Sequence, residues 1–509
     1  MVLVAVRERA SSIGVPPRVP RTWRCKMDTR LVNEFRSIVG DAGLVAGAEQ
    51  LRTYECDGLT LFRVAPDLVL LPSSAQETQA IVKICHRERI PFVARGSGTG
   101  LSGGALPIKG GVVISLTRMN RILEIDVPNA RVVVEPGVTN AAITAAVSAH
   151  GYFYAPDPAS QVVCTVGGNV AENSGGVHCL KYGLTVHNVL RVRGYTIEGE
   201  ALDLGSEALD SPGYDLLALA IGSEGLLAVT TEVTVKLLPR PETARVIMAS
   251  FDEVDKAGDA VAAVIAAGIV PAGLEMMDKP ATAAVEQFVR AGYDLEAAAI
   301  LLCESDGTAA EVEDEIARMK EVLTRAGARR LTVSRDEAER LRFWSGRKAA
   351  FPAVGRISPD YYCMDGTIPK KRLGEILKFI AAMEKKYGLR CPNVFHAGDG
   401  NLHPLILFDA NDPDQLKRTE AFAAEVLEKC VDVGGTITGE HGVGVEKIDQ
   451  MCVQFGAGEL EAFNGIKRAF DAKGLLNPGK AVPALAHCAE FGRRHVKAGQ
   501  LGHPGLPRF

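Results

Sequence analysis

Apolar and polar residues alternate in blocks that predict a β-α-β unit near the start of the chain. The segment "DLVLLP" (residues 67–72) is typical of a buried strand, and "PFVAR" (91–95) predicts a second one. Between them, residues 73–90 begin with serines suited to capping and continue with apolar residues at helical spacing, which predicts a helix. The same patterns predict further strands at residues 110–116 and 131–137 and a helix at 140–150. This part of the chain is therefore expected to be an α+β domain rich in glycine.

The pattern changes near residue 240 and predicts a second domain. Residues 224–239 end in an alternating strand pattern that two prolines terminate, which marks a boundary. Beyond it, helical patterns at residues 252–267 and 308–326 flank a short apolar strand at 299–305. The expected organisation is an extension at residues 1–26, a helical lead-in at 27–61, a first domain at 62–241, a second domain at 242–483 and a tail at 484–509.

The first domain contains a glycine-rich loop that imitates a nicotinamide dinucleotide motif. Residues 98–103, "GTGLSG", match the expression G-x-G-x-x-G. That motif must run from a strand directly into a helix, whereas the segment that follows, "GALPIKGGVVISL", predicts a loop leading into a strand. We therefore reject a Rossmann fold. The loop still suits close approach of backbone amides to a phosphate, with a flexible surface turn as the alternative if it is considered alone.

Composition excludes several classes of protein. The chain has 509 residues, of which 47% are hydrophobic and 23% charged, which indicates a globular protein of two or three domains. A net charge of −5 argues against a nucleic-acid partner. The longest apolar run, residues 260–274, is too short and too broken by glycine and proline to span a bilayer, so no transmembrane segment is expected.

The 11 cysteines form no C-x-x-C pair, which argues against a zinc ribbon and a cysteine-ligated iron–sulfur cluster. They are expected to be reduced thiols in a cytoplasmic protein. Residues 1–26 are basic, with Glu8 as the single acid, and lack a signal-peptide core. We expect a disordered extension there, with Met27 as the true start; an organellar transit peptide is the alternative.

The second domain carries a candidate metal site. In "VFHAGDGNLHPLILF" (394–408), Asp399-Gly400 is typical of a two-residue hairpin turn. Such a turn would place His396 opposite His403, with Cβ atoms about 4.5–5.5 Å apart. Two imidazoles at that separation can share a divalent metal, although a purely structural pair is the alternative.

A nearby segment offers the carboxylate that such a metal site requires. In "GGTITGEHGVGVEK" (434–447), Glu440 stands beside His441 among glycines. Histidine nitrogens and a carboxylate suit zinc, manganese or iron, and a catalytic site keeps a position open for substrate. The sequence thus predicts a divalent metal held by His396, His403 and Glu440.

Four glycine-, asparagine- and serine-rich segments, at residues 94–104, 154–160, 165–176 and 220–235, resemble the FAD-binding domain of the vanillyl-alcohol oxidase and p-cresol methylhydroxylase family. The resemblance implies an α+β protein with a two-part FAD-binding domain followed by an α+β substrate (cap) domain. It implies FAD contacts from Gly96, Ser97, Gly98, Thr99, Gly100, Pro156, Ser160, Thr165, Gly168, Asn169, Asn173, Gly176, Glu224 near the adenosine, and Asn477. Covalent members often place a histidine where this chain has Thr99, so non-covalent FAD is expected.

The second domain resembles that of flavin-dependent D-2-hydroxy-acid dehydrogenases through "H-x-G-D-G-N-x-H" and "G-E-H-G". This resemblance implies that His396, His403 and Glu440 ligate the metal. It implies that His441 is the general base, and that Arg347, in "FWSGRKAAFP" (343–352), pairs with the substrate carboxylate.

Longer segments, including "PNVFHAGDGNLHPLILFDAN" and the tail "CAEFGRRHVKAGQLGHPGLPRF", resemble the FAD-linked subunits of bacterial glycolate oxidases. The resemblance implies metal-assisted oxidation of glycolate to glyoxylate by hydride transfer to flavin. It also implies a second flavoprotein-like subunit and an iron–sulfur subunit, which would bring a cytoplasmic chain to the inner face of the cell membrane.

The substrate is expected to be a short monocarboxylate such as glycolate or D-lactate. The chain offers Phe351 and Cys363 where relatives that take dicarboxylates hold the second carboxylate, and an unpaired buried charge is costly. Tyr361 and Tyr362 either close the pocket or belong to the core. A dehydrogenase for D-lactate or another D-2-hydroxy acid, and a flavin-binding structural subunit without activity, are the alternatives.

Overall fold

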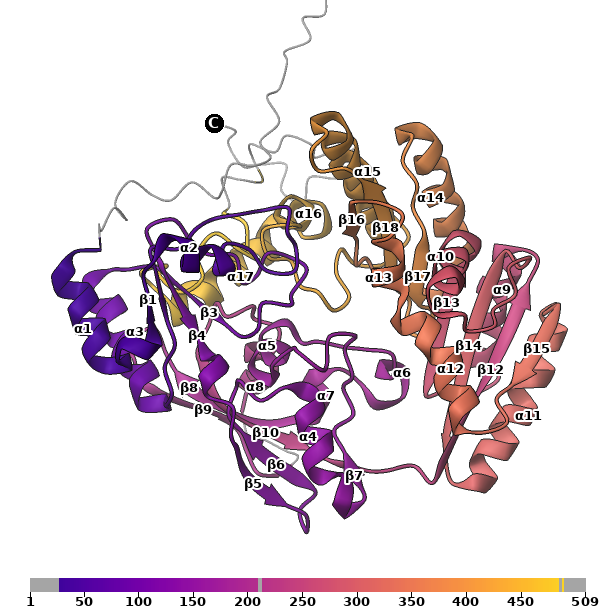
Figure 1. Ribbon diagram of the computed structural model, residues 1–509, viewed down its shortest axis with the longest axis horizontal. Coiled ribbons are helices and arrows are strands. Elements are labelled where there is room, and N and C mark those ends of the chain that lie inside the picture. The colour runs from indigo at the N-terminus through magenta and orange to yellow at the C-terminus, as the bar shows by residue number, and fades with distance from the viewer. Residues whose placement is uncertain (1–26, 209–212, 485–487, 489–509) are drawn as a thin grey trace, which may run out of the picture.

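The computed structural model describes residues 27–208, 213–484 and 488, and Figure 1 shows that they form two halves. The expected extension at residues 1–26 and almost all of the expected tail lie outside the described residues. Helix α1 to strand β11 make up one half, strand β12 to the loop that follows helix α15 make up the other, and the last helices return to the first half.

The first half begins with the predicted β-α-β unit, which is confirmed. Its sheet has the order β1 (Leu44–Val45), β2 (Leu68–Leu70), β4 (Val112–Ser115), β3 (Phe92–Arg95). Helix α3 (Ala75–Glu88) connects β2 to β3, and its cap Ser74 accepts a hydrogen bond from the Glu77 amide. Strands β2 and β3 both run parallel to β4.

The lead-in is not purely helical. Helices α1 (Thr29–Val39) and α2 (Ala48–Leu51) are present as expected, but strand β1 between them pairs antiparallel with β2. Leu31 and Phe35 of α1 are buried in the same core as the first sheet. The lead-in therefore extends this sheet and covers it.

A second, antiparallel sheet completes the first half. Its order is β5 (Ile122–Asp126), β6 (Arg131–Val134), β10 (Val229–Lys236), β8 (Val189–Tyr195), β9 (Ala201–Gly205), and a small pair joins β7 (Tyr152–Phe153) to β11 (Leu238–Pro239). The helices here are α4 (Asn140–Val147), α5 (Val166–Glu172), α6 (Cys179–Tyr182), α7 (Thr185–Asn188) and α8 (Leu216–Ala220). The alternation expected near residue 230 is confirmed, because Val229, Val233 and Val235 of β10 are buried.

The second half is a seven-stranded antiparallel sheet between two helix layers (Figure 1). Its order is β15 (Arg330–Val333), β12 (Thr243–Phe251), β14 (Ala299–Gly307), β13 (Gly273–Asp278), β17 (Asn393–His396), β18 (Asn401–Phe408), β16 (Asp360–Cys363). One face packs against α9 (Val254–Ala266), α11 (Ala309–Arg325), α14 (Leu373–Tyr387) and α15 (Pro413–Asp432), and the other against α10 (Lys279–Val289), α12 (Glu337–Lys348) and α13 (Ala350–Val354).

The chain then returns to the first half through α16 (Ile448–Gln454) and α17 (Ala457–Phe470). The Phe92 amide of β3 donates to the Leu475 carbonyl, N···O 2.9 Å, and the Asn477 amide donates back to the Phe92 carbonyl, 2.8 Å. Lys467 of α17 donates to the Leu226 carbonyl, 2.8 Å. The second half is thus anchored on the first at both of its ends.

Two expectations from composition can be compared with this fold. Among the described residues, no helix combines the length and the apolar character needed to cross a bilayer. The expectation of reduced thiols is wrong for one pair, because Cys452 of α16 and Cys488 are joined in a disulfide, with Cα atoms 5.4 Å apart. The fold brings them together across 36 residues of sequence, a proximity that spacing alone does not reveal.

Candidate active site

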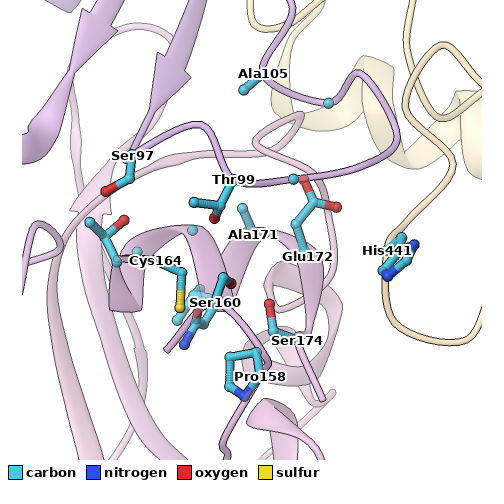
Figure 2. A pocket seen from close by; sticks show the side chains of 18 of the residues that line it. Ser97, Thr99, Ala105, Pro158, Ser160, Cys164, Ala171, Glu172, Ser174 and His441 are labelled. Carbon is cyan, nitrogen blue, oxygen red and sulfur yellow. The ribbon is translucent and has the colours of Figure 1, made fainter. Parts of the chain in front are cut away.

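A cavity of about 660 Å³ is lined by both halves of the chain. Of the residues expected to bind FAD, its wall contains Gly96, Ser97, Gly98, Thr99, Gly100, Ser160, Thr165, Gly168, Asn169 and Glu224. The second half contributes all the expected catalytic and metal-binding residues, Arg347, His396, His403, Glu440 and His441. Figure 2 shows His441 on one side of the cavity, facing Glu172 and Ser174 on the other.

Four of the residues expected to contact FAD do not line the cavity: Pro156, Asn173, Gly176 and Asn477. Their contact with FAD stays a prediction. Asn173 is the left-handed C-cap of α5 and accepts from the Val186 amide. Asn477 donates to the carbonyls of Gly104 and Glu224, at 3.1 and 2.7 Å. Asn477 therefore supports the wall from behind, because Gly104 and Glu224 both line the cavity.

Glu224 joins the two halves. Its carboxylate accepts hydrogen bonds from the backbone amides of Val443 and Gly444, each 2.6 Å long. It therefore lies against the loop that carries His441, and its expected position near the adenosine stays a prediction.

The first-half wall fits a dinucleotide. Gly98 adopts φ +73°, and a side chain at Gly96 would strike the Thr165 hydroxyl, so both positions need glycine. The Thr165 hydroxyl and the Asn169 side-chain nitrogen are buried with no hydrogen-bond partner among the described residues. Buried polar groups are normally paired, and a bound phosphate or flavin edge would supply the missing partners.

The histidine hairpin differs in register from the expectation. Strands β17 and β18 place His396 opposite Asn401, so residues 397–400 form the loop and the predicted direct pairing with His403 is wrong. The turn is wider because Gly400, at φ +89°, donates its amide to the His396 carbonyl. A shift of two residues keeps both histidines on one face of the sheet, and their ring centroids are 5.0 Å apart.

The candidate metal ligands converge as the sequence predicts. Glu440 Oε1 lies 3.1 Å from His403 Nε2 and 3.4 Å from His396 Nε2. Donors of one tetrahedral zinc ion, with bonds of about 2.0–2.2 Å, are separated by about 3.3–3.6 Å. The donor set therefore fits a divalent ion of this size.

Glu275 is a functional residue that the sequence analysis missed. One carboxylate oxygen contacts His396 Nδ1 at 2.7 Å, and the other accepts from Arg347 Nε at 2.7 Å. Burial opposes the charged imidazole, but Glu275 and Glu440 outweigh it and raise the pKa of His396 well above its ordinary value. The same carboxylate thus orients a candidate metal ligand and the arginine that is expected to bind substrate.

We expect Glu275→Ala to lower metal affinity about 10- to 100-fold, the usual effect of removing a carboxylate behind a ligating histidine. Metal content and titration with zinc or manganese measure this loss. Glu49→Ala, at an exposed position of α2, is the control. Unchanged metal affinity in Glu275→Ala would contradict the assignment.

Asp365 is a second missed residue, and it builds the loop that carries Glu440 and His441. Its carboxylate accepts from the amides of Gly439, Glu440 and His441 at 3.0, 3.1 and 2.8 Å. Lys447 Nζ lies 3.3 Å away. Burial opposes ionisation, but neighbouring cationic groups outweigh it and lower the pKa of Asp365.

His441 is partly buried and is available to accept a proton. Its ring stacks on that of His403 with centroids 4.9 Å apart, and its Nδ1 has no hydrogen-bond partner among the described residues. Burial lowers the pKa of His441 to about 4. The imidazole is therefore neutral at pH 7, with an unused ring nitrogen.

Comparison with known proteins gives this geometry its context. The chain matches the FAD binding domain over residues 66–205 and the C-terminal domain of FAD linked oxidases over residues 240–481. It is 58% identical over 481 residues to glycolate oxidase subunit GlcD of Escherichia coli K12, covering 94% of this chain and 96% of that protein. The chain belongs to the FAD-linked oxidase family.

The chain is also similar to a further relative and, in its fold, to a solved structure. D-lactate dehydrogenase of Anaerostipes hadrus is 33% identical, over 89% of this chain and 98% of that protein. The crystal structure of p-cresol methylhydroxylase with substrate bound superposes with a TM-score of 0.75 at 18% identity, covering 89% of this chain and 96% of that one. The predicted fold class, FAD as cofactor and oxidoreductase activity are confirmed.

Proposed function

We propose that this FAD-linked oxidoreductase oxidises short 2-hydroxy acids, with glycolate as substrate and glyoxylate as product. One observation carries the proposal. The cavity that is expected to hold FAD is also lined by Arg347, His441 and the candidate metal ligands. Oxidation of a 2-hydroxy acid needs a cation that binds the carboxylate of the substrate and a base that removes the proton from its hydroxyl group.

Arg347 binds the substrate carboxylate in this proposal. Its Nε is paired with Glu275, while its Nη2 is buried and has no hydrogen-bond partner among the described residues. An arginine held in this way offers a fixed, charge-assisted contact and so sets which face of the α-carbon meets the cofactor.

His441 takes the hydroxyl proton. Bound FAD would accept the hydride from the α-carbon, and a divalent ion at His396, His403 and Glu440 would favour ionisation of the hydroxyl. Asp365 holds the backbone of His441 in place, so the imidazole is positioned before substrate arrives.

The cavity favours a small substrate. Phe351 and Tyr361 both line it, with ring centroids 5.8 Å apart, whereas Tyr362 packs in the core. Cys363 is buried beside His403, Sγ to Nδ1 3.8 Å. Similarity to a D-lactate dehydrogenase supports D-lactate as the second candidate substrate.

The proposal is tested by anaerobic titration of the metal-containing holoprotein with glycolate and, separately, D-lactate, while flavin absorbance is followed. We expect glycolate to bleach the flavin and chelation of the metal to abolish bleaching. Stronger bleaching by D-lactate would favour the second candidate. A flavin that stays oxidised with both acids would support a structural subunit, and bleaching that survives full chelation would remove the metal from the mechanism.

We also propose that the chain works within a complex that includes a second flavoprotein-like subunit and an iron–sulfur subunit. The name of the E. coli relative, a subunit, supports this proposal. In that assembly a cytoplasmic chain would associate with the inner face of the membrane through its partners. Copurification from native cells, with iron analysis of the complex, tests it.

A further inference from the structure

Glu172, the last residue of α5, has a carboxyl group between the two loops that form the catalytic end of the cavity. A Cβ atom on Gly104, in the glycine-rich segment, would lie 2.7 Å from Glu172 Oε1. A Cβ atom on Gly442, next to His441, would collide with Oε2. Figure 2 shows the side chain of Glu172 on the cavity side that faces His441. Glycine at both positions leaves room for this carboxyl group.

One oxygen of this carboxyl group is buried without a partner in the described part of the chain. Glu172 Oε2 is buried without a hydrogen-bond partner among the described residues. The neighbouring Glu224, in contrast, has both oxygens satisfied by backbone amides. A buried polar atom without a partner is destabilising, so a ligand that pairs with Glu172 would offset this cost.

The surroundings favour the neutral form of this side chain. Burial, together with the carboxyl groups of Glu224 and Asp57, raises the pKa of Glu172 well above its ordinary value. Lys447 and Lys480 oppose this effect, but their ammonium groups also donate to backbone carbonyls, to Gly442 and Gly104 respectively. A neutral carboxylic acid has one O–H donor available.

The flavin ring must reach this end of the cavity. Hydride transfer requires the reacting ring to adjoin the substrate, and Arg347 and His441 mark where the substrate binds. Glu172 shares the cavity wall with both of them. We propose that Glu172 donates a hydrogen bond, as a neutral carboxylic acid, to the flavin ring of bound FAD and stabilises the reduced ring. The inference rests on FAD binding and does not depend on which 2-hydroxy acid is the substrate.

Three variants test this inference without any substrate. Glu172→Met keeps the length of the side chain and removes the donor, Glu172→Gln keeps a neutral donor, and Glu49→Ala is the exposed control. Each protein is stripped of FAD and reconstituted, and the FAD dissociation constant, the flavin midpoint potential and the thermal unfolding curve are measured.

We expect Glu172→Met to bind FAD about tenfold more weakly, the equivalent of one lost hydrogen bond, and to have a more negative midpoint potential. Glu172→Gln should stay close to the parent protein in both measurements. Equal FAD dissociation constants and equal midpoint potentials in all variants would overturn the proposed hydrogen bond between Glu172 and the flavin ring. A higher midpoint potential in Glu172→Gln would overturn the neutral form, because removing a negative charge favours the reduced ring.

The design also separates a steric role from the proposed one. If Glu172→Met cannot retain FAD, Glu172→Gln decides alone: retention with the parent potential supports the inference, and loss of FAD from a folded Glu172→Gln protein overturns it. A flavin that binds normally but is reduced by neither glycolate nor D-lactate would count against the proposed function and leave this inference standing.

Discussion

His441→Ala should retain its FAD yet be reduced by glycolate about 10²- to 10⁴-fold more slowly than the parent protein, the range that a lost general base produces. The retained flavin is expected because the glycine-rich wall that fits the dinucleotide belongs to the first half, whereas His441 lies on the loop after α15. Anaerobic stopped-flow absorbance of the flavin measures the rate.

The matched control for this experiment is His150→Ala, which removes an exposed imidazole from the first half. It should be reduced at the parental rate. If His441→Ala were also reduced at that rate, the base would have to be another group, and the proposed role of His441 would be wrong.

Arg347→Ala should raise KM for glycolate about 10- to 100-fold, because a hydrogen bond to a charged group is lost. It should also destabilise the fold by up to about 3–5 kcal/mol, since Glu275 loses one of its two buried charged partners and keeps only His396. Steady-state kinetics and denaturant unfolding measure the two effects.

The double variant Arg347→Met/Glu275→Gln separates these contributions. Removing both charges should recover much of the stability but leave KM high, because the substrate carboxylate still lacks its cation. Arg347→Lys keeps the positive charge but cannot make the paired hydrogen bonds of a guanidinium group. Its KM for glycolate should lie between those of the parent protein and Arg347→Ala. Recovery of KM in the double variant would contradict direct binding of substrate by Arg347.

The histidines and Glu440 that the structure brings together, as expected from the sequence, share one property: each stands in a short motif with its own local signal. His396 and His403 were expected on one face of a hairpin, and they lie there although the turn is wider than a two-residue loop. The error had no effect on the face they share, because the side-chain period of a strand is two and the register moved by two.

Glu275 and Asp365 show what sequence patterns could not reveal. Glu275 lies in the apolar strand β13, more than 100 residues before its partner His396, and only the pairing of β13 with β17 brings them together. The available signal was an acidic residue within "GLEMMD", a buried strand, which requires a partner. Asp365 lies just after β16, and three of its partners are backbone amides, which have no signature in the sequence.

The anchoring of the second half at both ends affects how the catalytic groups of the two halves stay assembled. A module attached by one linker samples a large volume, so its side chains meet the cofactor at an effective concentration that the linker length limits. Here the chain leaves the first half after β11 and returns to β3 at residues 475–477. With two fixed attachment points, His441 and Arg347 have little translational freedom left to lose when the substrate is bound.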